Sequence, residues 1–578
     1  MSEAEPRMAN SVSSDPPMAA IAPVSNAGRQ NALAHMTTHP EHGDAKPNGL
    51  EVDDDHSSTV HRLRGSRAQT RRSTSSVTST SSVSTIPRLE AVVARVRSRP
   101  PIVPSNFTHE LEHQKTTVED LVDFDGADDT YWPINWSMKK KVITTALYSF
   151  TTLTASWASS AFSPGTQQVA QHFGVSNQVA TLGTSLFLFG FGLGPLLWAP
   201  LSEVFGRKTS VLPPMLVAIC FEFAAGSASD FQTLMIARFF AGFFAAAPVT
   251  NTGGVLSDLF PPSQRGIAMA AYAMAVVLGP GLGPIVGAAL VVQPRLGWRW
   301  TEYFSGILQV TVLIVDVIFL DESYPPRLLV YKARRLRHQS GNWALHAKFE
   351  EWDISLGELA RKFLVRPIQL LTTPICFLMA LYASFCYGIL YMQLGAIPLI
   401  FEQHRGWRAV PASVPFSSLL VGSFLGAVVN VYNQMVYNKK TAGKVAPELR
   451  LPPMMVGSVF FSAGLFITGW TADPSYPWIA PVIGIAMTGF GFFTVFQAAL
   501  NYLVDTFSAY AASAVAANTF LRSCFAGAFP LAIAPLYNRV GIPWGTSIFG
   551  FFAIAMVPVP WVFYIFGGRI RKKGKWSR

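Results

Sequence analysis

Charged residues are scarce in this chain. Only 14% of its 578 residues are Asp, Glu, Lys or Arg, whereas 50% are hydrophobic and 12% aromatic, and the mean hydropathy is +0.30. Soluble globular proteins carry about 25% charged residues. The composition therefore excludes an ordinary soluble protein and predicts an all-α polytopic membrane protein.

Cysteines and several catalytic motifs are also rare or missing. The four cysteines lie in apolar segments without paired spacing, and we interpret them as packing residues: Cys220, Cys376, Cys386 and Cys524. The chain has no GxxxxGK[ST] loop and no GxSxG, which argues against ATP-driven export and against a membrane enzyme. We expect no catalytic residue, no metal and no cofactor.

Long apolar runs, by contrast, are abundant after residue 141. A helical span needs about 20 mainly apolar residues. Twelve spans are predicted, with cores at 142–162, 179–200, 209–229, 232–256, 266–291, 298–321, 371–397, 411–432, 452–471, 477–501, 511–535 and 543–567. The basic runs occur in every second connection between spans, which places them on one side of the membrane. This side is expected to be the cytoplasm and to hold both termini. This placement also explains the net charge of +11 without nucleic-acid binding.

The spans divide the chain into five parts. We predict a disordered cytoplasmic tail at 1–130, a six-helix half at 131–321, a cytoplasmic linker at 322–370, a second six-helix half at 371–567 and a basic tail at 568–578. Apolar spacing in the linker predicts an amphipathic helix on the membrane face through Phe349, Trp352, Leu356, Leu359 and Phe363. The serine-rich run at 73–85 is either a phosphorylated, regulatory segment or a plain solvated one. Asn106 and Asn135 begin glycosylation triplets, but a cytoplasmic position would leave both unmodified.

Arg238 is the most unusual residue of the predicted spans. An arginine within a span costs roughly 2.5–3.5 kcal/mol on insertion scales, so it normally faces a protein interior or a wet pathway. Its alternative is to snorkel toward the nearby membrane surface. Glu222 lies at a similar depth in the preceding span, and an antiparallel hairpin turning near Asp230 would let the two residues pair. The hypothesis is that Glu222 is the proton-titratable partner of Arg238; the alternative is that it faces another helix.

The loop APLSEVFGRK at 199–208 joins spans two and three. Such a short connection needs Gly206 for a tight turn, and the carboxylate of Glu203 can pair with nearby basic groups. Asp258 ends span four at the same expected depth as Arg207 and Lys208. We predict that Arg207 and Asp258 form an inner-face latch that holds an outward-facing state; an ordinary positive-inside turn is the alternative.

Span five carries a ladder of small residues. Gly279, Gly283 and Gly287 share one helix face, and Pro280 and Pro284 remove backbone donors beside them. Such a face is typical of close helix packing. A transport-specific role is the second interpretation.

Polar and aromatic residues on other spans are candidates for a substrate cavity, although many membrane Tyr and Trp residues belong to interfacial belts. The candidates are Tyr148, Trp157, Asn251, Tyr382, Tyr387, Tyr391, Gln497, Asn501, Asn518 and Arg522. Arg522 stands out because it lies about half a span deep.

Three of these segments resemble, in chain order, motifs of the major facilitator superfamily. The 199–208 loop resembles motif A, RFFAG from Arg238 resembles motif B, and the Gly279 to Ala288 ladder resembles the antiporter motif C. The first match departs at Ala199, Glu203 and Val204, so the full charge relay of the superfamily is not expected. The resemblance implies a twelve-helix fold of two six-helix halves, and its motif C implies antiport and export.

From residue 132 onward the chain is similar to the fungal twelve-span drug:proton antiporters, through strings such as GWRWTEYFSGI, ESYPPRLLVYKARRLR and AANTFLRS. This similarity implies a monomer in the plasma membrane, with a vacuolar membrane as the alternative. Its partners would be protons, the lipid bilayer and amphipathic or cationic small molecules such as drugs, toxins and polyamines. The alternatives are a dedicated exporter of one endogenous metabolite or organic acid, and a non-transporting sensor.

Overall fold

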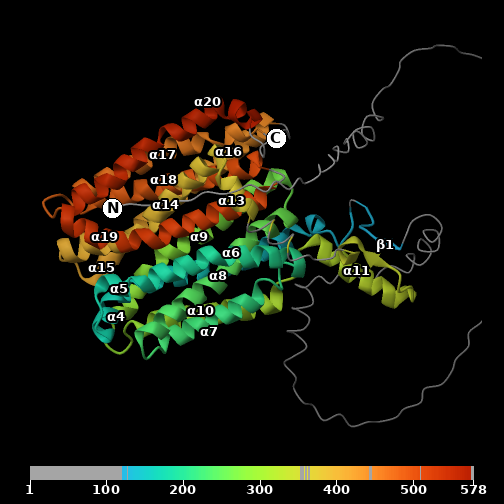
Figure 1. Ribbon diagram of the computed structural model, residues 1–578, viewed down its shortest axis with the longest axis horizontal. Coiled ribbons are helices and arrows are strands. Elements are labelled where there is room, and N and C mark those ends of the chain that lie inside the picture. The colour runs from blue at the N-terminus through green and yellow to red at the C-terminus, as the bar shows by residue number, and fades with distance from the viewer. Residues whose placement is uncertain are drawn as a thin grey trace, which may run out of the picture. The chain divides into compact units, whose positions relative to one another are not determined.

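The computed structural model describes residues 120–573 except 127, 352–356, 358–360, 362–364, 442–445 and 508–509. The expected serine-rich segment and Asn106 lie outside these residues, as do four of the five apolar positions of the expected linker helix and residues 574–578. The described chain is a bundle of long helices with one two-stranded sheet (Figure 1).

The first half of the bundle contains six long helices, joined in part by the short helices α4 (Thr166–Phe173) and α5 (Asn177–Ala180). The long helices are α3 (Met138–Ala161), α6 (Leu182–Phe205), α7 (Leu212–Gly226), α8 (Phe231–Leu259), α9 (Pro262–Val292) and α10 (Arg299–Phe319).

The second half begins after the short helix α13 (Arg366–Leu371). Its helices are α14 (Pro374–Pro398), which continues as the π-helical turn η5 (Leu399–His404), α15 (Ala409–Ser413), α16 (Phe416–Thr441), α17 (Pro452–Trp470), α18 (Ile479–Thr506), α19 (Ala511–Met556) and α20 (Pro558–Lys573). Gly541, with φ of 79°, interrupts α19 and divides it into two arms.

Helix ends follow local chemistry. The side chain of Asp230 accepts a hydrogen bond from the backbone N–H of Thr233 at 2.7 Å and caps α8, and Ser137 caps α3 in the same way. The Asp230 cap lowers the pKa of that carboxyl. Prolines occupy the first turn of α7, α9, α14 and α17, where a missing N–H costs no helical hydrogen bond.

Nine stretches of the described residues are long and apolar enough to cross a membrane. One of them, Ser513–Lys572, holds both arms of α19 together with α20. α7 is apolar but shorter, and α3 is rich in Ser and Thr. The two arms of α19 divide the last stretch into two crossings, and α3 and α7 add two more. The described chain thus accounts for the twelve predicted crossings, and the predicted fold class is confirmed.

The most extensive contacts between the two halves are those of α6 with α19 and of α9 with α16. Within the first half α3 lies against α9 and α10, and α8 lies against α6 and α7.

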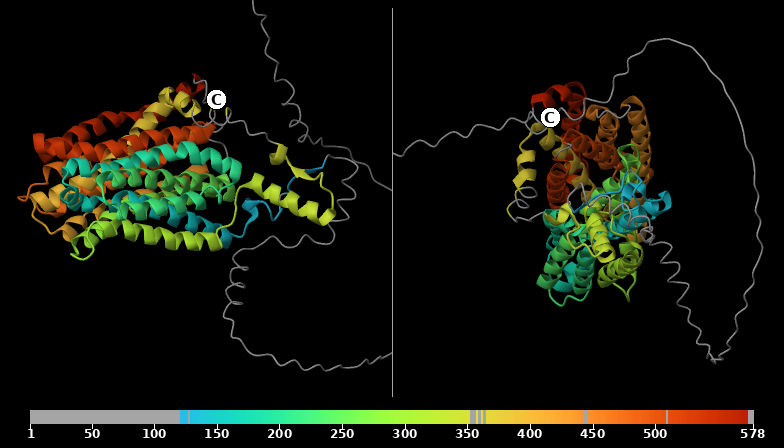
Figure 2. Two further views of the ribbon diagram at one scale, coloured as in Figure 1. Left: turned by 60° about the horizontal axis from the view of Figure 1, so that its bottom comes forward. Right: turned by 90° about the vertical axis from the view of Figure 1, so that its right-hand side faces the viewer.

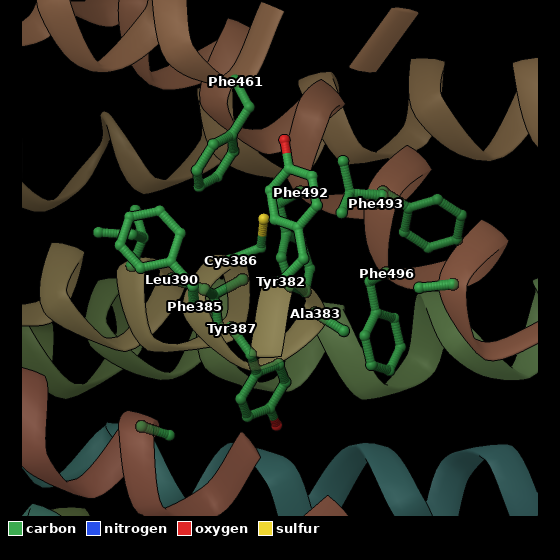
Figure 3. Close-up of a cluster of buried hydrophobic side chains, with 14 of the residues drawn as sticks. Tyr382, Ala383, Phe385, Cys386, Tyr387, Leu390, Phe461, Phe492, Phe493 and Phe496 are labelled. Carbon is green, nitrogen blue, oxygen red and sulfur yellow. The ribbon is translucent and has the colours of Figure 1, made fainter. Parts of the chain in front are cut away.

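In the second half α14 is buried on nearly all sides, and its aromatic residues form a core with α17 and α18 (Figure 3). Cys376 and Cys386 are buried in this core, but Cys220 is exposed, so the packing interpretation is wrong for Cys220.

The end of the bundle at which α3 begins and α10 ends is called the linker face below, and the other end the opposite face. The linker leaves the linker face through α11 (Pro325–Ser340), which Figure 2 shows beyond the ends of the long helices. α11 is the main described helix of the linker, upstream of the predicted amphipathic segment. Phe349 lies instead in the 3-10 turn η3 (Lys348–Glu351).

Part of the expected tail packs on this linker. β1 (Leu121–Val122) pairs in parallel with β2 (His346–Ala347), and the ammonium of Lys332 on α11 lies 2.8 Å from the carboxylates of both Asp125 and Asp129. Burial alone would raise the pKa of Asp129, but its hydrogen bonds from Lys332 and backbone N–H groups lower it overall. Residues 120–126 and 128–130 therefore form a clasp on α11, where we expected a disordered tail.

Candidate functional site

A cluster of three charged side chains lies inside the first half, toward the opposite face. The guanidinium of Arg238 on α8 is 3.2 Å from the carboxylate of Glu302 on α10 and 3.8 Å from that of Glu222 on α7. All three residues are at most 1% exposed. The structure thus brings Arg238 and Glu222 together, as the hairpin argument required, and adds Glu302.

The protein interior holds the Arg238 side chain in place. Nη1 donates to the carbonyl of Ala158 on α3 at 3.0 Å, and Nε donates to that of Gly183 on α6 at 3.2 Å. The guanidinium also lies over the ring of Phe187, with its carbon 4.6 Å from the ring centroid. With contacts to four other helices and no exposed surface, Arg238 does not snorkel, and that alternative is wrong.

Charge balance gives this cluster its chemistry. One guanidinium and two ionised carboxylates would leave a net charge of −1 in a site without water access, which is costly. One added proton makes the cluster neutral. Glu302 was missed in the sequence because it stands in the first turn of its helix, where an acidic residue is the usual complement to the helix dipole. Its burial depends on how α10 is rotated in the bundle.

A second charged cluster lies at the linker face. Nε of Arg207 is 3.0 Å from Oδ2 of Asp258, Nη1 donates to Ser202 at 2.9 Å, and the guanidinium lies over the ring of Tyr324. Burial would lower the pKa of Arg207, but the carboxylate of Asp258 more than offsets it and holds that pKa above its ordinary value. Burial raises the pKa of Tyr324 to about 12, with a further contribution from the half-buried Glu203. The expected Arg207–Asp258 pair is present.

Glu322, which follows α10, organises the turn that contains Arg207. Its carboxylate accepts the backbone N–H groups of Arg207 at 2.8 Å and Lys208 at 3.1 Å. Gly206 has φ of 93°, and a Cβ there would lie 2.6 Å from Oε2 of Glu322. Lys208 in turn donates to the carbonyl of Leu320 at 2.6 Å. Glu322 begins the string ESYPPR, but its contact across more than a hundred residues gave no local signal.

The glycine ladder of α9 packs on α3. A Cβ at Gly279 would lie 2.6 Å from the backbone nitrogen of Trp157, one at Gly283 would overlap the hydroxyl of Ser160, and one at Gly287 would lie 2.5 Å from the carbonyl of Ala161. The helices therefore touch backbone to backbone. Pro280 and Pro284 lie within the same part of α9.

Near the boundary between the halves, Arg522 of α19 is 5% exposed. Its guanidinium carbon lies 4.4 Å from the ring centroid of Tyr387 and 5.3 Å from that of Phe496. Tyr387 also contacts Tyr391, whose hydroxyl is 2.8 Å from that of Ser159 on α3. No carboxylate of the described residues forms an ion pair with Arg522, so this is a buried cation held by aromatic faces.

The other predicted cavity residues are dispersed. Trp157 donates to Ser305 at 3.2 Å, and Asn251 donates to the carbonyl of Ser210 near the linker face. The hydroxyl of Tyr382 points away from Tyr387, across α14 (Figure 3). Buried polar atoms without a hydrogen-bond partner remain on Tyr148, Tyr382, Gln497 and Asn518, while Asn501 is half-buried. The structure thus groups Tyr387, Tyr391 and Arg522, but not Asn251 or Tyr382.

Comparison with known proteins agrees with this architecture. Residues 148–530 match the family model of the Major Facilitator Superfamily, and the chain belongs to this superfamily of membrane transporters.

Two curated relatives are similar over most of their length. The chain is 46% identical over 479 residues to the efflux pump bik6 of Gibberella fujikuroi, covering 82% of this chain and 98% of that protein. It is 40% identical over 465 residues to the multidrug transporter FLU1 of Candida albicans, covering 79% and 76%. The solved structure of the xylose transporter XylE from E. coli matches with a TM-score of 0.54 at 16% identity, covering 73% of this chain and 97% of that one, which shows the shared fold.

Proposed function

We propose that the chain exports amphipathic small molecules from the cytoplasm in exchange for protons, and that Arg238, Glu222 and Glu302 form the coupling site. The observation that carries this proposal is the buried cluster of one cation and two carboxylates. A proton is the simplest ion that can neutralise the cluster, and neutralisation weakens the hold of Glu302 on Arg238. Export is supported by the printed names of bik6 and FLU1, an efflux pump and a multidrug transporter.

In this proposal the linker face is cytoplasmic, because the basic residues of the turn after α6, of α11 and of α20 gather there. The protein is placed in the plasma membrane. The cluster lies toward the opposite, external face, where protons are more abundant. Protonation then favours substrate release outside, and proton loss to the cytoplasm resets the carrier, while the halves rock about the α6–α19 and α9–α16 contacts.

The primary test uses purified protein in vesicles, with rhodamine 6G as a cationic amphipathic probe. Wild-type protein should accumulate the dye against its gradient only when a pH difference is imposed, and a protonophore should abolish accumulation. Glu302→Gln should lose accumulation by about tenfold or more but retain dye exchange without a gradient. In this variant the charges of Arg238 and Glu222 cancel without an added proton. Glu402→Gln, an exposed carboxylate near the opposite face, is the control. Accumulation by Glu302→Gln at the wild-type rate would refute this coupling site.

In cells, the same proposal predicts resistance that depends on the proton gradient. Deletion and overexpression should change tolerance to some of a panel of azoles, polyamines and organic acids. A protonophore should remove the protection. Protection that survives collapse of the gradient would contradict antiport.

A second substrate class is favoured by Arg522. A buried cation that lies on aromatic rings and has no acidic partner among the described residues is suited to a planar organic anion. This supports the alternative of a dedicated exporter of an acidic metabolite. Fluorescein and rhodamine 6G share a xanthene skeleton but differ in charge, so they form a matched pair of probes. Preferential transport of fluorescein that Arg522→Gln abolishes and Arg522→Lys partly retains would favour this class; equal effects on both dyes would argue against it.

A further inference from the structure

Polar side chains recur along one face of α10. Glu302, Gln309 and Asp316 follow each other at intervals of seven residues, which places them on the same side of the helix. All three are at most 1% exposed. A heptad spans about 10.5 Å, so this series covers about 21 Å between the coupling site and the linker face.

α3 supplies polar groups opposite this series. Ser305 accepts from Trp157 at 3.2 Å, and the amide of Gln309 donates to the carbonyl of Thr154 at 3.4 Å. Further toward the linker face, Thr151 donates to Oδ2 of Asp316 at 2.5 Å. The hydroxyl of Thr154 donates to the carbonyl of Thr151 at 3.0 Å, so polar contacts continue along α3 between Gln309 and Asp316.

Asp316 is the least expected member of the series. It is 0% exposed, its Oδ1 has no hydrogen-bond partner, and none of the described cations lies within ion-pair distance of it. The charged and titratable groups near Asp316 are Lys208 of the turn after α6 and Tyr148 of α3, and Tyr148 in turn lies near Arg207, Asp258 and Glu322. Lys208 is held by the carbonyl of Leu320, one turn beyond Asp316, and Arg207 is paired with Asp258. A buried carboxylate in this position is stable when it carries a proton and costly when it does not.

We propose that Asp316 is the inner station of the proton route and passes protons between the Glu302 cluster and the cytoplasm. This inference rests on the proposed function. The O–H bond of a protonated carboxyl in the Glu302 cluster breaks, the proton crosses the polar α3–α10 contact, and a new O–H bond forms on Asp316. Breaking that bond releases the proton at the linker face and restores the carboxylate. No other bond changes.

The test compares two readouts in vesicles with rhodamine 6G as the probe: accumulation driven by a pH difference, and dye exchange without one. Asp316→Asn keeps an oxygen that can accept from Thr151 but cannot carry the proton. It should lose driven accumulation by about tenfold or more and keep exchange near the wild-type rate. Asp316→Glu should retain a substantial part of accumulation. The matched control is Asp321→Asn. Asp321 is five residues away and outside the series, and its carboxylate pairs with Lys140 at 2.9 Å.

Three other results would overturn the assignment. Wild-type accumulation by Asp316→Asn shows that the route bypasses this residue. Loss of both readouts in Asp316→Asn and Asp316→Glu shows that Asp316 only packs α3 against α10. Absence of any effect of the pH difference on wild-type protein refutes the proposed antiport itself, and with it the route, so the two failures are distinguishable.

Discussion

The backbone N–H of Arg207 donates to the carboxylate of Glu322 at 2.8 Å, which ties the turn between α6 and α7 to the end of α10. The same carboxylate also accepts the N–H groups of Ser323 and Tyr324, at 3.0 and 2.9 Å. One side chain therefore fixes two chain segments at the linker face, and the turn beneath it has no room for an additional atom.

The fit at this turn predicts that Gly206→Ala is strongly destabilising. The alanine at position 206 must adopt a positive φ, which costs of order 1–3 kcal/mol, and its methyl group must displace the carboxylate of Glu322. Thermal unfolding of the purified protein should show a lower midpoint. Gly253→Ala is the control, because a Cβ at Gly253 in α8 has no neighbour within 4 Å. Equal midpoints for the two variants would show that the turn tolerates a side chain.

For the Arg207–Asp258 pair, Asp258→Asn should reduce export, because the buried guanidinium of Arg207 then loses the opposite charge that pairs with it. The exchanged pair Arg207→Asp with Asp258→Arg should recover part of the activity if the charge pair acts as a latch. Recovery will be incomplete, since an aspartate cannot stack on Tyr324. A charge-swapped protein that is folded but as inactive as Asp258→Asn would contradict the latch.

The contact between α9 and α3 predicts a compensating pair of substitutions. Gly283→Ala places a methyl group against the hydroxyl of Ser160, so export should fall several-fold as the helices are forced apart, in line with overpacking costs of about 1–3 kcal/mol. Adding Ser160→Gly removes the nearest atoms and should restore much of the rate. In Gly287→Ala the obstacle is the carbonyl of Ala161, which no substitution removes. A double variant no better than Gly283→Ala would exclude a steric cause.

The clasp on α11 is expected to depend on pH. Because docking lowers the pKa of Asp129, its contribution to stability is present at neutral pH and is lost as the pH falls through that lowered value, below 3.8. Asp129→Asn should mimic this loss at neutral pH and accelerate hydrogen exchange in residues 120–126 and 128–132 by roughly tenfold. The exposed neighbour Asp128 offers the control Asp128→Asn. Unchanged protection in Asp129→Asn would mean that the β1–β2 pairing and the Asp125–Lys332 contact hold the segment without Asp129.

Features that repeat along one helix could be read from the sequence. Apolar length gave the spans, glycine spacing gave the face of α9 that meets α3, and the shared depth of Arg238 and Glu222 anticipated their contact. These properties depend on helix geometry and membrane thickness, which the chain carries locally.

What the sequence did not reveal depends on helix rotation and on contacts between distant segments. Glu302 has the position of an ordinary first-turn acid, and Asp316 that of a last-turn residue, until the rotation of α10 turns Glu302 toward Arg238 and Asp316 toward Thr151 of α3. The clasp pairs residues 121 and 346, which no periodicity connects. Asn251 and Tyr382 share the polarity of the residues near Arg522 but face elsewhere.

Two successive residues of α3 have different partners. The carbonyl of Ala158 accepts a hydrogen bond from Arg238, and the hydroxyl of Ser159 meets Tyr391 of the other half. A change in the hold of Arg238 on α3 therefore reaches the seam between the halves within a single peptide unit. In the proposed mechanism, protonation of the Arg238 cluster would therefore reach the seam between the halves through α3 itself, without a long relay.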